Sequence, residues 1–129
     1  MAAHSTPLNA LSRAQLLDVV KSTGDLLFVL DSAHRFVDAN GVACERTGYR
    51  RQDLLAQKLS ILFPPRARAL HSATIFSVLK KSGRWSGELE LRRKDGSTFP
   101  LSASAALYGG GTNGPPFCLL VGQDLTHQR

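Results

Sequence analysis

The sequence has few cysteines, few aromatic residues and no long apolar run. Its two cysteines, Cys44 and Cys118, lie far apart, a spacing that favours neither a zinc site nor a disulfide framework and is typical of a reducing, cytoplasmic setting. No apolar stretch approaches the roughly 20 residues of a membrane-spanning helix, so we expect no membrane contact from this chain. The N-terminal residues carry neither a basic leader nor an apolar stretch, so we expect no secretion signal.

Patterns for catalysis and for nucleic-acid binding are also missing. The chain has a net charge of +6, but its basic residues are scattered, and aromatic residues are not interleaved with them as a base-stacking platform would require. We interpret this charge as a solvated surface and expect no nucleic-acid partner. Paired carboxylates, nucleophile motifs and metal-ligand clusters cannot be recognised, so we predict no catalytic residue, no metal site and no enzymatic activity in this chain.

The length and the hydrophobic content fit one compact domain with its own core. The chain has 129 residues, of which 43% are hydrophobic. Residues 1–11 are small and polar, and we expect them to be flexible. Ser12 opens a capping box with Gln15, and the helix that follows stops near Gly24. We therefore expect a single domain over residues 12–129 that includes this N-terminal helix. The helix carries an apolar stripe of Leu16, Leu17, Val19 and Val20.

Local signals predict the order of the remaining elements. Asn40 and Gly48 suit the two ends of a short helix, and Gly83 suits the end of the longest one. Beyond Gly83 the apolar residues alternate, and Asp95-Gly96 predicts a hairpin turn. A five-stranded antiparallel sheet with helices packed on one face, an α+β fold, satisfies this order. The expected strands are residues 26–31, 35–39, a run centred on 89–91, 99–107 and 117–121. The expected helices are residues 41–47, 52–55 and 66–81.

Several short motifs occur in a fixed order along the chain. They are Leu27–Asp31 with Phe36–Asn40, Gly48-Tyr49, Trp85–Glu88, Arg93–Ser97 with Phe99-Pro100, and Asp124-Leu125-Thr126. Each motif alone is unspecific. Their order and spacing together resemble those of the PAS sensor domain family, and the resemblance covers residues 12–129.

The resemblance implies a sensory and dimerisation module of a bacterial-type signalling protein, such as a sensor histidine kinase, a cyclic-di-GMP enzyme or a transcriptional regulator. In such proteins the helices and the sheet enclose a small cavity, and the signal leaves through the last strand, where Asp124 and Thr126 mark the exit. Any kinase or cyclase activity would belong to the effector domain, outside this chain. We expect a homodimer through the N-terminal helix, because its apolar stripe needs cover. The candidate cavity residues are Phe28, Ile75, Leu79, Leu101 and Leu119.

The resemblance leaves the cofactor open, and a domain without any cofactor is our main interpretation. The blue-light branch needs a cysteine that residues 58–63 lack and a glutamine where this chain has Gly122, so that branch is excluded. Haem-binding members carry their axial histidine on the longest helix, where His71 could bind iron or be a core histidine. Flavin-binding members carry a Trp-Ser-Gly stretch like that at Trp85, which could equally pack at the helix-to-strand junction. His71 lies among the apolar positions of its helix, which are Ala67, Leu70, Ile75, Val78 and Leu79.

Overall fold

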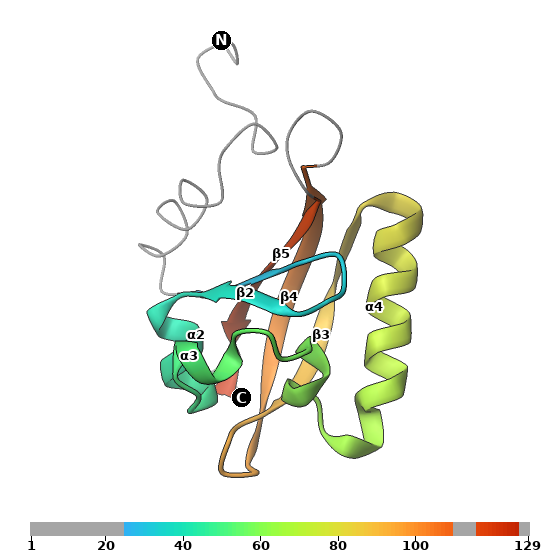
Figure 1. Cartoon of the computed structure of the whole chain (residues 1–129). Coiled ribbons are helices and arrows are strands. Elements are labelled where there is room, and N and C mark those ends of the chain that lie inside the picture. The colour runs from blue at the N-terminus through green and yellow to red at the C-terminus, as the bar shows by residue number, and fades with distance from the viewer. Residues whose placement is uncertain (1–24, 110–115, 127–129) are drawn as a thin grey trace, which may run out of the picture.

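The computed structural model describes residues 25–109 and 116–126, and these are organised around one antiparallel sheet. The strands lie in the order β2-β1-β5-β4-β3, so that the first and the last strand are neighbours in the middle of the sheet (Figure 1). The predicted five-stranded antiparallel sheet is confirmed. The strands are β1 (Leu26–Leu30), β2 (Phe36–Ala39), β3 (Arg84–Arg92), β4 (Thr98–Tyr108) and β5 (Phe117–Asp124).

The described helices all lie in the connection between β2 and β3, and they cover one face of the sheet (Figure 1). Within the described part of the chain, no helix is long and apolar enough to cross a membrane. The flexible segment and the helix predicted for residues 1–24 lie outside the described residues, so the domain boundary at residue 12 stays a prediction. The helices are α2 (Gly41–Thr47), α3 (Arg51–Leu54), the 3-10 turns η3 (Leu59–Leu62) and η4 (Pro65–Ala67), and α4 (Arg68–Ser82).

The ends of α2 and α4 follow the predicted signals. Gly48 and Gly83 end these helices with φ angles of 79° and 78°, in the left-handed region that glycine adopts without a steric cost. The Gly83 N–H donates to the carbonyl of Leu79 at 2.8 Å, which satisfies one of the free carbonyls at the end of α4. The sharp stop at Gly83 sends the chain straight into β3.

The apolar face of α4 differs from the predicted one. Ile75 and Leu79 are buried, but Leu70 is 68% exposed and Val78 is 37% exposed, so placing these two on the core face was wrong. At about 100° per residue, Leu70 lies about 140° around the helix from Ile75 and faces solvent. The half-buried Phe76 packs against the core instead.

The core fills the layer between the helices and the sheet. Its largest members are four phenylalanines with 0–1% exposure: Phe28, Phe36, Phe63 and Phe99. On the inner face of β4, residues Phe99 to Ala105 are buried at every second position, as expected for a strand with one covered face. Leu107, the next residue in this series, is 46% exposed. The core layer is therefore closed over most of the sheet and open at one end.

Asn40 is a buried polar residue that joins three elements. Its Oδ1 accepts from the N–H of Leu27 in β1 at 3.0 Å and from the N–H of Ala43 in α2 at 2.9 Å. Its Nδ2 donates to the carbonyl of Asp25 at 2.9 Å, just before β1. The side chain thus caps α2 and holds this helix against the first strand.

Gly122 allows close packing at the middle of the sheet. A Cβ at this position would lie 2.6 Å from Leu101 Cγ and Cδ2 and 2.8 Å from Cδ1. Separations this short are strongly repulsive, so Leu101 occupies the space that any other side chain at position 122 would need.

We predict that Asn40→Ala lowers the free energy of unfolding by about 3 kcal/mol, because it removes the helix cap and leaves the buried Leu27 N–H without an acceptor. Urea unfolding followed by the fluorescence of Trp85, the single tryptophan, measures this change. Gln52→Ala, an exposed change on α3, is the control and should alter stability by less than about 0.5 kcal/mol. A loss below about 1 kcal/mol in Asn40→Ala would contradict the role given to its side chain.

We predict that Gly122→Ala costs about 2 kcal/mol of stability, because the new methyl group collides with Leu101. Leu101→Ala should cost about 3 kcal/mol by itself, and the double variant should cost clearly less than the sum, because the cavity left by Leu101 accepts the methyl group. Gly41→Ala is the matched glycine control, since nothing lies within 4 Å of its added Cβ. Strict additivity of the two changes would rule out the steric explanation.

Candidate functional site: an apolar groove and the end of the central strand

The open end of the core layer forms a groove with a volume of about 590 Å³. It lies between α4, the β1–β2 turn and the adjoining ends of β4 and β5 (Figure 1). Its location follows from the sheet order, because the central strand β5 begins beside the turn that links β1 to β2. The groove walls include His34, Phe76, Leu79, Leu107, Phe117 and Cys118.

His34 covers Phe76 at one side of the groove. The two rings are stacked, with 3.5 Å between their centroids and 7° between their planes. The backbone of His34 has a φ of 65°, and its carbonyl accepts from the N–H of Leu59 at 3.0 Å, which ties the turn to η3. Burial lowers the pKa of His34 below its ordinary value, the charge of Lys58 lowers it further, and Asp31 opposes the change. The imidazole is therefore neutral near pH 7 and acts as a flat aromatic surface.

The cysteines are unsuited to thiolate chemistry. Cys118 forms part of the groove wall, and its burial raises the pKa of the thiol to about 12. Burial also raises the pKa of Cys44, although the charge of Arg51 opposes this effect. Both thiols remain protonated at neutral pH. No cluster of three metal-ligating side chains occurs among the described residues.

At the far end of β5 lies the predicted signal exit. The Asp124 carboxylate accepts from the N–H of Thr126 at 2.9 Å and from its hydroxyl group, and it pairs with Arg46 Nη1 on α2 at 3.4 Å. Burial would raise the pKa of Asp124, but the Thr126 hydrogen bonds and the charges of Arg46 and Arg93 outweigh it, so this pKa lies below its ordinary value. Asp124 is therefore ionised at neutral pH and holds the chain where it leaves the sheet.

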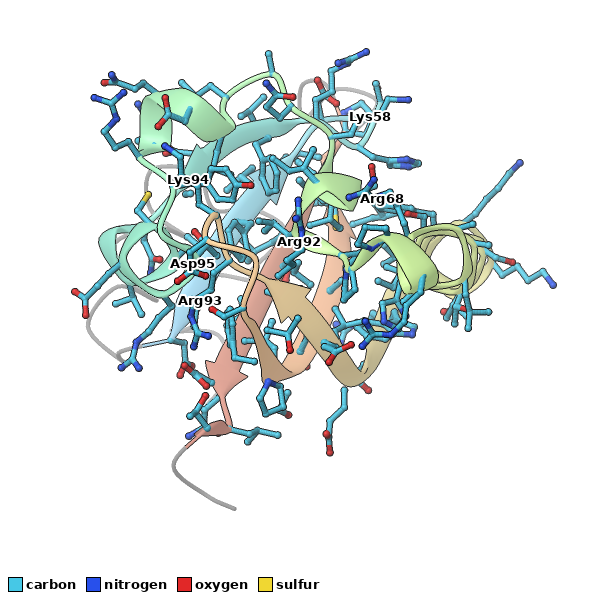
Figure 2. The ribbon with its side chains drawn as sticks, turned by 90° about the horizontal axis from the view of Figure 1, so that it is seen from below. Lys58, Arg68, Arg92, Arg93, Lys94 and Asp95 are labelled. Carbon is cyan, nitrogen blue, oxygen red and sulfur yellow. The ribbon has the colours of Figure 1, made fainter. Side chains whose placement is uncertain are left out.

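Arg93 supports this exit from the β3–β4 turn. Its Nε donates to the carbonyl of Arg46 at 3.0 Å, and its guanidinium group lies over the Phe99 ring at 4.4 Å from the centroid. Figure 2, which views the sheet from this end, shows Arg93 beside Asp95 on the turn. The Leu125 N–H donates to the carbonyl of Pro100 at 2.9 Å, which fixes the residue between Asp124 and Thr126.

The surroundings of His71 do not fit a haem. The ring is half-buried and meets Phe63 edge-on at 5.1 Å between centroids. The pocket beside it includes the acidic residues Glu88 and Glu90, the second of which pairs with Arg66, and its described lining holds no lysine or arginine to bind the propionate groups of a haem. Ile75, one turn further along α4, is fully buried in the closed core. The haem role of His71 stays a prediction without support from this geometry, and an absorption spectrum would test it.

A flavin is disfavoured on similar grounds. Leu101 already occupies the space beside Gly122, the position at which the blue-light branch has its glutamine. Trp85 is half-buried against the core, and its ring covers Gly87, where a Cβ would lie 3.0 Å from the ring. The flavin role of Trp85 also stays a prediction, and its observed contacts are those of a packing residue.

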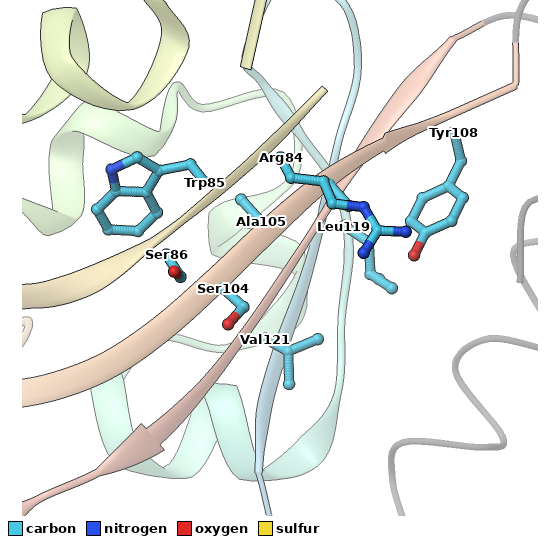
Figure 3. Close-up of a pocket in the computed structure, with 9 residues that line it drawn as sticks. Arg84, Trp85, Ser86, Ser104, Ala105, Tyr108, Leu119 and Val121 are labelled. Atoms are coloured by element: carbon cyan, nitrogen blue, oxygen red, sulfur yellow. The ribbon is translucent and has the colours of Figure 1, made fainter. Parts of the chain in front are cut away.

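Among the candidate cavity residues, Leu119 was wrongly placed. Phe28, Ile75, Leu79 and Leu101 belong to the core cluster on the helix side, and only Leu79 also borders the groove. Leu119 packs on the opposite face of the sheet, because side chains alternate along β5. There it borders a hollow of about 410 Å³, and Figure 3 shows Leu119 and Val121 on the other side of the sheet from Trp85.

Sequence reasoning missed His34 and Phe76 as site residues. The Ser32–His34 stretch indicated only a turn, and nothing in it pointed towards α4. For Phe76 a signal existed, since its three-residue spacing from Leu79 places it at the edge of the buried face of a helix. The contact between them depends on how the turn folds back onto α4, and no local pattern predicts that.

Comparison with known proteins agrees with this architecture. A family model described as a PAS domain matches residues 24–127, and no curated protein matches the chain. A PAS domain of a protein from Colwellia psychrerythraea is similar with a TM-score of 0.78 and 23% identity, over 91% of this chain and 96% of that one. A PAS domain from a two-component sensor histidine kinase gives a TM-score of 0.71 and 17% identity, over 86% and 94% of the two chains. A light-oxygen-voltage domain studied with a flavin analogue gives a TM-score of 0.76 and 20% identity, over 88% of this chain and 87% of that one.

These structural likenesses show the fold, and the family model adds the sequence pattern. Its match begins just before β1 and ends just after the Asp124–Thr126 exit, so it includes the whole sheet and every described helix. The chain therefore belongs to the PAS domain family of sensory modules.

Proposed function

We propose that this PAS domain is the sensory and dimerisation module of a cytoplasmic, bacterial-type signalling protein. It passes the state of a small ligand in the groove to an effector attached beyond Thr126, without catalysing a reaction itself. The effector would be a histidine kinase, a cyclic-di-GMP enzyme or a transcriptional regulator. The observation that carries the proposal is that one strand, β5, borders the groove with Phe117 and Cys118 and ends at the Asp124 exit.

The position of β5 in the sheet supports its use as the connection. Residues Phe117–Asp124 each pair with a residue of β4, and Cys118–Gly122 also pair with β1 on the other side. A strand hydrogen-bonded on both edges cannot shift without either moving its neighbours or breaking those hydrogen bonds. A ligand that displaces the first residues of β5 would therefore shift the opposite end, where Arg46 and Thr126 hold Asp124.

Dimerisation is proposed to occur through the N-terminal helix, residues 13–22. The apolar stripe of this segment needs cover from the domain or from a second copy. The sheet face opposite the helices carries a second apolar cluster, which includes Leu27, Val29 and Leu119.

We predict that Asp124→Ala reduces the response of the full signalling protein to its input by about fivefold or more, because the contacts that hold the exit are lost. A change of this size corresponds to a typical coupling free energy between two sites. The assay is effector output with and without stimulus. Asp124→Asn keeps an acceptor for the Thr126 N–H and should lose less of the response. Glu45→Ala, which changes an exposed acid on α2, is the control and should leave the response intact. An unchanged response in folded Asp124→Ala would remove β5 as the signal path.

We predict that the chain sediments as a dimer and that Leu17→Glu or Val20→Glu converts it to a monomer, because a charge in the apolar stripe cannot be buried without a partner. Ser22→Glu adds the same single negative charge outside the stripe and should leave the dimer intact. Sedimentation equilibrium distinguishes the two states. A monomeric wild-type chain, or a dimer that survives both stripe variants, would refute this contact.

A further inference from the structure

The groove offers a flat apolar surface. The Phe76 ring, covered on one side by His34, lies next to Leu79 on α4. Leu107 on β4 lines the groove together with Phe76 and Leu79. It is 46% exposed, although the other inner-face residues of that strand are almost fully buried. An exposed leucine at the end of an otherwise closed core marks apolar area that a ligand would cover. A volume of about 590 Å³ suits a small aromatic molecule.

The mouth of the groove carries an unpaired lysine. Lys80 lies on the rim, and no acidic side chain pairs with it among the described residues. Lys58 lies close enough to His34 to affect its titration. Asp31 is the one acid among the described lining residues, and its Oδ1 already accepts from the N–H groups of Ala33 at 2.8 Å and Arg35 at 3.0 Å. A carboxylate on a ligand would therefore find a free ammonium group at Lys80 on α4, and the one opposing charge among these residues, Asp31, belongs to the β1–β2 turn.

We propose that the groove binds an aromatic monocarboxylate, whose ring lies between Phe76 and Leu107 and whose carboxylate pairs with Lys80. This ligand class deepens the sensing function proposed above and rests on it for its biological meaning. The apolar walls account for the ring, and the unpaired Lys80 accounts for the single negative charge. A cationic or uncharged compound of the same shape would gain the apolar contact alone.

Calorimetric titration of the full chain with naphthylacetate tests this assignment. Naphthylethylamine and naphthylethanol serve as the cationic and neutral probes of similar size. We expect naphthylacetate to bind most tightly and the amine most weakly. Amide NMR shifts locate the site, and the largest shifts should fall on Phe76, Leu107 and Cys118. Equal affinity for all three probes, or no binding of naphthylacetate, would overturn the proposal.

Two matched pairs of variants assign the contacts. Ala73→Trp places a large ring in the groove and should abolish binding, whereas Thr74→Trp changes the next position of α4, an exposed residue that does not line the groove, and should bind normally. Ser77→Trp is a second blocking variant if Ala73→Trp does not fold. Lys80→Gln should weaken naphthylacetate binding about threefold to fivefold, as expected for an exposed ion pair, while Lys81→Gln should have no effect. Normal binding by a folded blocking variant would refute the site.

The same titration separates this inference from the signalling proposal. If naphthylacetate binds in the groove but the amides of Leu125 and Thr126 do not shift, the ligand assignment holds and coupling through β5 fails. If Asp124→Ala uncouples the full protein but naphthylacetate does not bind, the signalling proposal holds and the ligand class is wrong.

Discussion

The Asn40 side chain is the interaction on which the rest of the architecture depends. One amide group satisfies the carbonyl before β1, an N–H inside β1 and one of the free N–H groups in the first turn of α2. A polar group buried in this way is costly unless all its hydrogen bonds form, so it selects one arrangement of the three segments. With α2 fixed against β1, the helical connection starts on one face of the sheet. β2 pairs with one edge of β1, and the opposite edge of β1 stays free to pair with β5.

Features set by neighbouring residues could be predicted from the sequence. The cap at Asn40, the glycine stop at Gly83 and the alternation along β4 depend on a few adjacent positions, and all three occur as expected. The exposed side of α4 was only partly predictable in this way. The spacing of Phe76 from Leu79 indicated the buried face, but the packed sheet decides that Phe76 is covered and Leu70 is not. The groove joins a turn, a helix and two strands that are distant in sequence, so its shape follows from the completed fold.

A second constraint decides where a ligand can enter. Leu101 occupies the space beside Gly122, and the phenylalanines around it close the centre of the core. Opening this centre for a cofactor would mean displacing well-packed side chains, and removing a single buried leucine already costs about 2–5 kcal/mol. At the end of β4 no such cost arises, since Leu107 is still largely exposed. The volume accessible to a ligand therefore lies at the end of the sheet and not in the middle of the domain.

The two ends of β5 are held with different strength, and this difference bears on how the strand would transmit a change. From Cys118 to Gly122 β5 has backbone partners on both sides, whereas the exit depends on Asp124, a 3.4 Å ion pair with Arg46 and the hydrogen bonds of Thr126. Arg46 Nε is buried without a hydrogen-bond partner among the described residues, so this guanidinium group is only partly satisfied. Exposed or long ion pairs contribute about 0–1 kcal/mol, far less than a paired strand. A small displacement of β5 would therefore break the exit contacts before it disturbs the sheet.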